Sequence, residues 1–349
     1  MVTESQVQRY DPASMRKLLA DFPKQVEDAV RIGHEARVRI PAGLVKNIVV
    51  TGLGGSAIGG DLLRSYLSSE IALPFIVNRH YLLPAFVNRD SLVLVSSYSG
   101  NTEETIAAHE EAVRRKAHVI CMSSDGVTAR MAAKFRQTLV TLPKGYPPRA
   151  ALGYSFFAPL VLLGRMKLIR SREKDILETL ELLSKKSRVL SSLDSRNPAL
   201  RLAAKLNGKL PVVYSSADKF DVVNLRWRGQ IAENAKTLAF GHVLPEMNHN
   251  ELVGWKVLSS VMKKIAVLML RDKEDHPRVQ LRMSLTENIV RSYAGDVVEL
   301  WSEGKSLLAR TFSLIYLGDW TSFYLAVLNR VNPTPVEIID TLKKKLGKV

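Results

Sequence analysis

Short apolar runs alternate with amphipathic segments along most of the chain. Each run is about as long as a strand, and the segment after it carries apolar residues at helical spacing. Uninterrupted apolar strands separated by helices are typical of a parallel sheet that is covered on both faces. In the first half this pattern predicts strands at 47–50, 75–77, 92–95, 118–122 and 138–142, with helices at 58–67, 103–115 and 128–134.

The same alternation returns in the second half of the chain. It predicts strands at 212–214, 266–270 and 297–300, with helices between them. A final helix, Val336–Leu346, follows Asn332-Pro333-Thr334-Pro335, where proline stands at a position that a helix start tolerates. The sequence therefore predicts an α/β protein with two similar, doubly wound domains, each a parallel sheet flanked by helices.

Two mainly helical regions bound and separate the predicted domains. Residues 12–36 have helical periodicity, and a long helical region at 154–190 becomes rich in Lys and Glu after Arg170. We expect the linker in this second region. The predicted boundaries are an N-terminal helical segment at 1–45, a first domain at 46–165, a helical linker at 166–200, a second domain at 201–331 and a C-terminal helix at 332–349.

The composition is that of a globular protein. The 349 residues include 46% hydrophobic and 24% charged side chains, enough for two sizeable cores. Charged residues precede any apolar run at the N-terminus and the apolar runs are strand-length, so we expect neither a signal peptide nor a membrane span. Cys121 is the only cysteine, which excludes an intramolecular disulfide and a cysteine-based zinc site. These features favour a cytoplasmic protein.

The formal charge of +16 raises the question of nucleic-acid binding. Lys and Arg are spread along the chain, apart from short clusters such as Arg114–Lys116 and Lys343–Lys345. Aromatic residues are 7% of the chain, and no RNA-binding or zinc-finger spacing is present. We interpret the charge as a solvated basic surface that attracts anionic substrates, with neither nucleic acid nor membrane as a partner.

A cluster of hydroxyl residues follows one of the predicted strands. After Leu92–Val95 the chain reads Ser96-Ser97-Tyr98-Ser99-Gly100-Asn101-Thr102 and then enters a predicted helix. Unpaired N–H groups at a helix N-terminus favour an anion, and Ser and Thr hydroxyls add donors. Because no lysine accompanies them, they suit a phosphate monoester held in position, such as a sugar phosphate, rather than a phosphate in transfer. For Thr102, an ordinary helix N-cap is the alternative.

A glycine-rich turn follows the first predicted strand. The stretch from Gly52 to Asp61 fits the dinucleotide fingerprint, but the acidic residue expected about 20 residues later is absent. Arg79 stands in that region, and an arginine there can accommodate the 2′-phosphate of NADP, so an NADP-binding form of the fingerprint stays open. In the alternative interpretation, Gly55 lets the backbone approach a sugar and Ser56 donates a hydrogen bond to it.

These two motifs, Gly54-Gly55-Ser56 and Ser97 to Thr102, resemble those of the sugar isomerase (SIS) domain family. Further motifs resemble those of its bifunctional phosphoglucose/phosphomannose isomerases, and the likeness runs over nearly the whole chain. These motifs are Pro148-Arg149-Ala150-Ala151, Gln230 to Lys236, Pro245 to Glu251, Asp21 to Gln25 and Leu342-Lys343. The resemblance implies two SIS domains, a homodimer and interconversion of glucose or mannose 6-phosphate with fructose 6-phosphate. It also implies that no metal or nucleotide cofactor is used.

Aldose–ketose isomerisation needs a base that moves a proton between C2 and C1 through an enediolate. The resemblance assigns this role to Glu233, since a carboxylate in a partly desolvated site is a competent base. Arg149 would stabilise the developing negative charge. Taken alone, either residue would be interpreted as an ordinary surface charge.

Ring opening needs a second proton transfer, and the resemblance assigns it to His249 and Lys343. Histidine titrates near neutral pH. In related isomerases this histidine enters from the neighbouring subunit, so a monomer is expected to be inactive. Lys344 and Lys345 stand beside Lys343 as alternatives.

Acceptance of mannose is associated in the family with a threonine shortly before the position of Lys343. Thr334 and Val336 are both candidates for the position of that threonine.

A second functional hypothesis is a SIS module that senses a sugar phosphate without catalysis. Regulators of that kind carry a DNA-binding helix pair before the SIS domain, whereas the sequence before the first strand shows one convincing helix.

Overall fold

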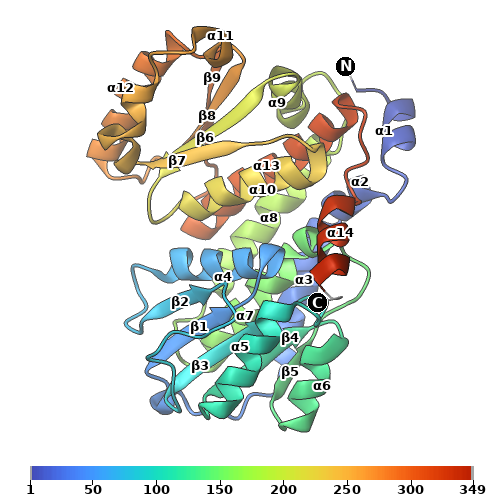
Figure 1. The fold of residues 1–349 in the computed structure, drawn as a ribbon, viewed down its shortest axis with the longest axis vertical. Coiled ribbons are helices and arrows are strands. Elements are labelled where there is room, and N and C mark those ends of the chain that lie inside the picture. Colours follow the sequence, from blue (N-terminus) through green and yellow to red (C-terminus); the bar gives the residue numbers. More distant parts are fainter. Residues whose placement is uncertain (1, 347–349) are drawn as a thin grey trace. The chain divides into compact units, whose positions relative to one another are not determined.

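The computed structural model describes residues 2–346 (Figure 1). The chain forms two compact units, each built around one parallel sheet. The sheet-A unit comprises Asp21–Glu181 with Ser306–Ala309, and the sheet-B unit comprises Met1–Ala20, Leu182–Lys305 and Arg310–Val349. The predicted class, α/β with two parallel sheets flanked by helices, is confirmed.

Sheet A has the strand order β2-β1-β3-β4-β5, and every pair is parallel. The central strand β3 and its neighbour β1 are almost fully buried, as their unbroken apolar runs require. The strands are β1 (Asn47–Thr51), β2 (Phe75–Asn78), β3 (Ser91–Ser96), β4 (His118–Ser123) and β5 (Thr138–Thr141).

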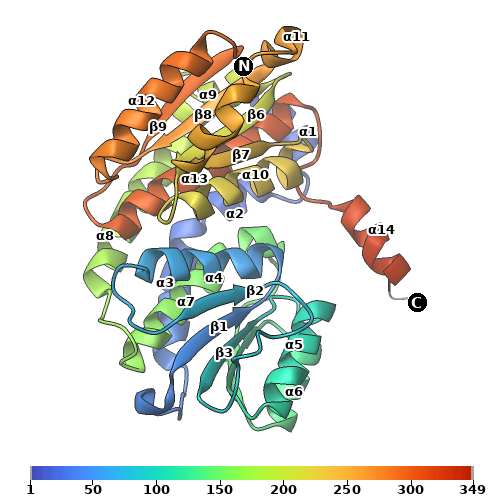
Figure 2. The ribbon, with the colours of Figure 1, turned by 60° about the vertical axis from the view of Figure 1, so that its left-hand side comes forward.

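Helices cover both faces of sheet A (Figure 2). Helices α3 and α7 pack on each other and α4 packs on α7, whereas α5 and α6 lie on the other face, where Ala108 and Ala112 meet Val93 and Val95. The helices of this unit are α3 (Phe22–Glu35), η1 (Ala42–Leu44), α4 (Gly54–Leu67), α5 (Glu103–Arg114), α6 (Gly126–Lys134), η2 (Pro148–Ala150) and α7 (Leu152–Arg165).

Sheet B has the order β7-β6-β8-β9, again all parallel. Its strands are β6 (Leu210–Ser216), β7 (Phe240–Leu244), β8 (Ile265–Arg271) and β9 (Asp296–Trp301). Its helices are α1 (Glu4–Tyr10), α2 (Met15–Ala20), α9 (Pro198–Leu206), α10 (Asp221–Ala235), η3 (Glu246–His249), η4 (Glu251–Gly254), α11 (Ser259–Met262), α12 (Pro277–Arg291), α13 (Leu307–Leu328) and α14 (Glu337–Leu346).

A buried ion pair fixes α10 against α13 in the sheet-B unit. Arg226 donates to both carboxylate oxygens of Asp319, at 3.1 and 2.7 Å, and Gln230 donates to the same carboxylate at 2.9 Å. Both members of the pair have side chains that are 4% exposed. Since an unpaired buried charge is costly, this network holds α10 in one position along α13.

Three regions differ from the sequence-based expectation. The helix predicted at 12–36 is divided into α2 and α3, with Pro23 in the first turn of α3. The helical region predicted at 154–190 is interrupted between α7 and α8 (Glu173–Leu190), and the two units meet in sequence within α8. Strand β7 was not predicted, because Gly241 and His242 interrupt its apolar pattern.

Both sheets have a topological switch point, the place where successive connections leave in opposite directions. In sheet A it lies between β1 and β3, and in sheet B between β6 and β8. Ligands of open α/β sheets bind in the crevice at the carboxyl ends of the strands at such a point. No helix within residues 2–346 is long and apolar enough to cross a membrane.

Candidate functional site

The two motifs singled out in the first half of the sequence meet at the switch point of sheet A. Ser56 lies in the first turn of α4, after β1, and its Oγ accepts a hydrogen bond from the Tyr98 amide at 3.2 Å. Ser97, directly after β3, donates through Oγ to Thr102 Oγ1 at 3.3 Å. The hydroxyl groups of the two loops therefore lie together at the carboxyl ends of β1 and β3, with Ser99 exposed to solvent.

Thr102 occupies the N-cap position of α5, but its side chain makes no capping hydrogen bond. The first-turn amides of α5 are thus not satisfied by the threonine that precedes them, and the positive end of the helix dipole faces the hydroxyl cluster. Gly100 shapes this loop: it has φ of +72°, and a Cβ there would lie 1.7 Å from the Asp125 carbonyl oxygen. This geometry favours an anion over a simple cap.

Gly55 allows the backbone of η2, which carries Arg149, to approach the first turn of α4. A Cβ on Gly55 would lie 2.4 Å from the Pro148 carbonyl oxygen and 3.0 Å from the Arg149 amide nitrogen, so only glycine allows η2 to approach α4 this closely. Arg149 is 4% exposed. The Arg149 backbone therefore lies against the first turn of α4, and its side chain is buried in the same unit as the hydroxyl cluster.

Arg79, the residue that left a dinucleotide interpretation open, is engaged inside the fold. Its guanidinium forms an ion pair with Asp61 of α4 and donates to the other carboxylate oxygen at 3.2 Å. The Arg79 guanidinium is therefore paired with a carboxylate of its own unit.

In the sheet-B unit, Glu233 lies in the last turn of α10 and is half-buried. Lys236, in the left-handed conformation just after α10, donates to the Glu233 carbonyl oxygen and, at 2.7 Å, to the Pro335 carbonyl oxygen. The loop that contains Thr334 is thereby tied to the end of the helix that carries Glu233. Lys236 was part of a recognised motif, but its bridging role depends on contacts about 100 residues apart and was not predicted.

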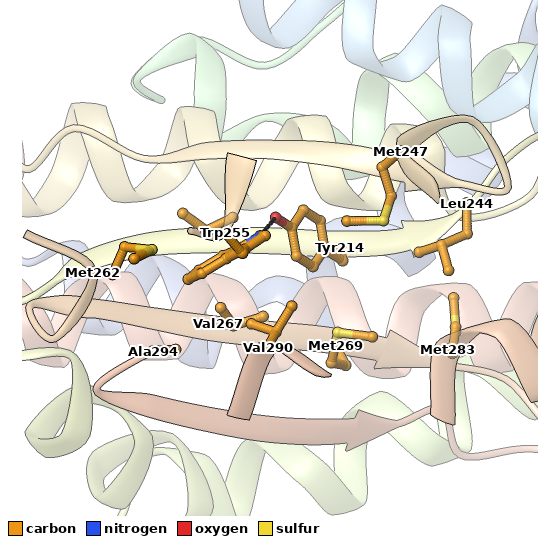
Figure 3. Close-up of a cluster of buried hydrophobic side chains, with 11 residues drawn as sticks. Tyr214, Leu244, Met247, Trp255, Met262, Val267, Met269, Met283, Val290 and Ala294 are labelled. Carbon is orange, nitrogen blue, oxygen red and sulfur yellow. Dashed lines mark hydrogen bonds between the residues drawn. The ribbon is translucent and has the colours of Figure 1, made fainter. Parts of the chain in front are cut away.

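His249 is exposed at the end of η3, in a segment that is tied down on both sides. On one side, Asn248 donates through Nδ2 to Thr286 Oγ1 of α12 at 2.8 Å. On the other, the hydroxyl of Tyr214 donates to Glu251, while Trp255 Nε1 donates to the same hydroxyl oxygen at 3.1 Å. Figure 3 shows this Tyr214–Trp255 pair within the core of the unit. Neither anchor was predicted from the sequence.

Lys343 lies on α14, a helix of which no described side chain is buried. Lys344 and Lys345 share its last turn, and all three are exposed. The structure thus groups Gly55, Ser56, Ser97, Ser99, Thr102 and Arg149 in the sheet-A unit, and it places Glu233, His249 and Lys343 on three separate elements of the sheet-B unit.

The switch point of sheet B holds acidic side chains. Asp272 accepts from Ser302 at 3.0 Å and from Arg310 at 2.9 Å, and Asp275 accepts from Ser216 at 2.7 Å. Burial raises the pKa of Asp275, and the neighbouring Asp272 charge adds to the rise. The carboxylates at this end of sheet B are therefore held by partners of the same unit, whereas the corresponding end of sheet A carries hydroxyl groups.

Comparison with known proteins gives concordant results. Residues 195–346 match the model of the bacterial phospho-glucose isomerase C-terminal SIS domain. The chain is 42% identical over 331 residues to the bifunctional phosphoglucose/phosphomannose isomerase of Caldicellulosiruptor bescii, covering 94% of this chain and 98% of the relative. It is 37% identical to the protein of that name from Aquifex aeolicus, covering 87% and 91%. A glucose-6-phosphate isomerase-like protein from Thermus thermophilus shares the fold, with a TM-score of 0.65, 19% identity and 98% of each chain covered.

Proposed function

The chain belongs to the family of bifunctional phosphoglucose/phosphomannose isomerases, and we propose that it interconverts glucose 6-phosphate or mannose 6-phosphate with fructose 6-phosphate. The structural observation that carries this proposal is the hydroxyl-lined switch point of sheet A. A helix N-terminus without a side-chain cap, surrounded by hydroxyl groups, suits a phosphate monoester that is held and not transferred.

In the proposed reaction, Ser56, Ser97, Ser99 and Thr102 bind the phosphate together with the backbone at Gly55. These contacts are made equally with substrate and transition state, so they contribute to binding more than to turnover. The phosphate fixes the position of the sugar chain relative to the catalytic groups.

Glu233 removes the proton from C2 and returns it to C1. Arg149 stabilises the negative charge that develops on the enediolate oxygen, which can lower the barrier by several kcal/mol when the charge is preorganised. The buried setting of Arg149 supports this role, since a guanidinium held in place by its surroundings needs little reorganisation during the reaction.

His249 and Lys343 open the sugar ring by moving a proton between the ring oxygen and the anomeric hydroxyl. We propose that the protein is a homodimer and that His249 enters the site of the neighbouring subunit; the exposure of His249 on an anchored segment supports this. Thr334 or Val336 contacts C2 and sets the acceptance of mannose. An enzyme of these substrates works in the cytoplasm, in glycolysis and gluconeogenesis.

A coupled assay with glucose 6-phosphate and mannose 6-phosphate in parallel, without added metal, tests the activity. Turnover of both substrates is expected. Glu233→Gln should abolish turnover but leave fructose 6-phosphate binding within a few-fold, whereas Glu181→Gln, at an exposed position of α8, should be fully active. Full activity in Glu233→Gln would refute the base assignment.

Mixing two inactive variants tests the exchange of His249 between subunits. If Glu233→Gln and His249→Ala chains form mixed dimers, one site in each mixed dimer is complete and about a quarter of the wild-type activity returns. No recovery would refute the exchange.

If neither sugar phosphate reacts and fructose 6-phosphate still raises the Tm, the protein is a sensor and the isomerase proposal fails.

A further inference from the structure

A cavity of about 760 Å³ lies at the edge of sheet A. It is lined by the edge strand β5 (Figure 1), the start of β4, the end of α3 and the segment 36–40 that follows α3. Small-molecule sites in proteins have volumes of roughly 300–1,000 Å³. All of the lining residues belong to the sheet-A unit. The cavity therefore has the size of a ligand site that this unit forms on its own.

Four basic side chains line the cavity, and none of them forms a side-chain hydrogen bond or an ion pair with another residue in the range 2–346. They are Arg37 and Arg39 from the segment after α3, Arg136 directly before β5, and His118 at the start of β4. The carboxylate in the lining, Glu35, is already paired with Arg31 at 2.8 Å. The cavity therefore has an excess of positive charge and attracts an anion.

The backbone of the segment 37–40 adds further donors. None of its amide groups donates a hydrogen bond to another residue in the described part of the chain, because α3 ends at Glu35 and the next element, η1, begins at Ala42. The Thr138 hydroxyl donates to the Arg37 carbonyl oxygen at 3.3 Å, which holds the segment beside β5. Backbone amides and guanidinium groups are the donors with which proteins bind phosphate, and this segment offers both.

Much of the remaining lining is apolar. Ile32, Ile40 and Leu139 are half-buried there, so part of their surface is left for a ligand to cover, and covering it is favourable. Gln137 adds a polar group: its Oε1 is bonded to His109, whereas its amide nitrogen has no partner among the described residues. The lining therefore suits a molecule that joins anionic groups to an apolar ring with hydrogen-bond acceptors.

We propose that this cavity binds a nucleoside diphosphate or triphosphate. The phosphate groups meet the guanidinium groups and the amides of the segment 37–40, and the base covers the apolar lining. Guanidinium planes also stack on rings, which adds to the attraction for the base. A sugar monophosphate has fewer charges and no apolar ring, so it uses only part of this lining.

The proposed nucleotide site is separate from the hydroxyl cluster that includes Ser97 and Thr102. That cluster lies at the carboxyl ends of β1 and β3. His118 and Arg136, by contrast, stand at the amino ends of β4 and β5. Because all strands of sheet A are parallel, these two ends lie on opposite sides of the sheet. The inference thus goes beyond the proposed function and does not rest on it.

Calorimetric titration with ADP, without magnesium, tests the inference in the presence and absence of saturating fructose 6-phosphate. ADP should bind in both cases, and at least tenfold more tightly than inorganic phosphate, which leaves the apolar lining uncovered. No binding of ADP up to about 1 mM would overturn the inference. Displacement of ADP by fructose 6-phosphate would also overturn it, since the two would then share one site. The titration without fructose 6-phosphate stands even if the isomerase proposal fails.

Removal of the positive charges provides the second test. Arg39→Gln combined with Arg136→Gln should weaken the binding of ADP and of pyrophosphate at least tenfold, and both positions are exposed, so the fold should be retained. Arg188→Gln combined with Arg201→Gln, at exposed positions of the sheet-B unit, lowers the net charge equally and should bind ADP like the wild type. An equal loss in this control would mean that the overall charge of +16 attracts ADP, and the inference would fail.

The apolar lining is tested with Ile40→Ala. This variant should weaken ADP binding about fivefold and leave pyrophosphate binding unchanged, because only the base covers Ile40. Val38→Ala, at a half-buried position outside the lining, is the matched control and should bind both like the wild type. Thermal unfolding checks that all variants are folded. If Ile40→Ala bound ADP as tightly as the wild type, the placement of the base would be wrong and the nucleotide assignment would fall.

Discussion

The hydroxyl of Tyr214 donates a hydrogen bond to the carboxylate of Glu251, two residues after His249. Tyr214 is fully buried on β6, in the middle of sheet B. Burial and the neighbouring Glu251 carboxylate raise the pKa of Tyr214, so the hydroxyl keeps its proton and acts as the donor. The position of an exposed segment is thus set by a side chain in the core.

Tyr214→Phe should therefore lower kcat about tenfold, the factor expected when a hydrogen bond of roughly 1.4 kcal/mol no longer holds a catalytic segment. KM for fructose 6-phosphate should change less than twofold, because the proposed phosphate contacts lie in the other unit. Steady-state kinetics in both directions measure the two effects. Tyr324→Phe removes another buried tyrosine hydroxyl of the same unit, bonded to the Leu190 carbonyl oxygen, and should leave kcat unchanged. A normal kcat in Tyr214→Phe would show that the anchor is purely structural.

Gly55→Ala should displace η2 and with it Arg149. The added methyl group would meet the Pro148 carbonyl oxygen at 2.4 Å, and overpacking of this kind costs about 1–3 kcal/mol. We expect a lower Tm and a loss of activity of at least tenfold. Gly43→Ala, where a Cβ meets nothing within 4 Å, is the control and should match the wild type in both measurements. If Gly55→Ala retained full activity, the close approach of the two loops would have no catalytic role.

Ser99→Ala combined with Thr102→Ala should raise KM at least tenfold for every sugar phosphate while kcat falls less than threefold. The physical reason is that contacts to a non-reacting phosphate stabilise substrate and transition state alike. Thr138→Ala, which removes a half-buried hydroxyl that donates to the Arg37 carbonyl oxygen on the edge strand β5, should leave KM unchanged. An unaltered KM in the double variant would contradict the assignment of the phosphate site.

His109 makes the stability of the sheet-A unit sensitive to mild acid. Burial lowers the pKa of His109, whose Nε2 lies 2.7 Å from Gln137 Oε1. Below pH 6.5 the unfolded chain takes up a proton that the buried imidazole does not, so the free energy of unfolding falls as the pH falls.

His109→Gln should remove the part of the pH dependence of the free energy of unfolding that His109 causes, which is at most about 1.4 kcal/mol per pH unit. Urea unfolding between pH 5 and 7 measures the slope, and His34→Gln, at an exposed position of α3, should retain the wild-type slope. If the free energy of unfolding of His109→Gln changed with pH as steeply as that of the wild type, another titratable group would dominate the pH dependence.

The sequence predicted the buried strands well because an unbroken apolar run leaves few alternatives. The strand predicted at 92–95 differs from the observed β3 by one residue at each end. Strand β7 was missed for a physical reason: Gly241 fits where any side chain would collide with the Val213 carbonyl oxygen, at 2.2 Å, and such a packing constraint leaves no local pattern.

The candidate site was predictable as far as its motifs were local. Ser97, Ser99 and Thr102 stand within a few residues of one another, and their helix N-terminus could be inferred from the same stretch. The anchors of His249 could not be, because Tyr214 and Glu251 are 37 residues apart, and Asn248 and Thr286 are 38 apart. Only the fold brings these pairs into contact.

The acidic switch point of sheet B has a consequence for how many ligands one chain accepts. Sheet B repeats the order of the first four strands of sheet A, but its switch point carries the carboxyl groups of Asp272 and Asp275, already bonded to Ser302, Arg310 and Ser216, in place of the hydroxyl cluster. Calorimetric titration with fructose 6-phosphate should therefore give a stoichiometry of one per chain.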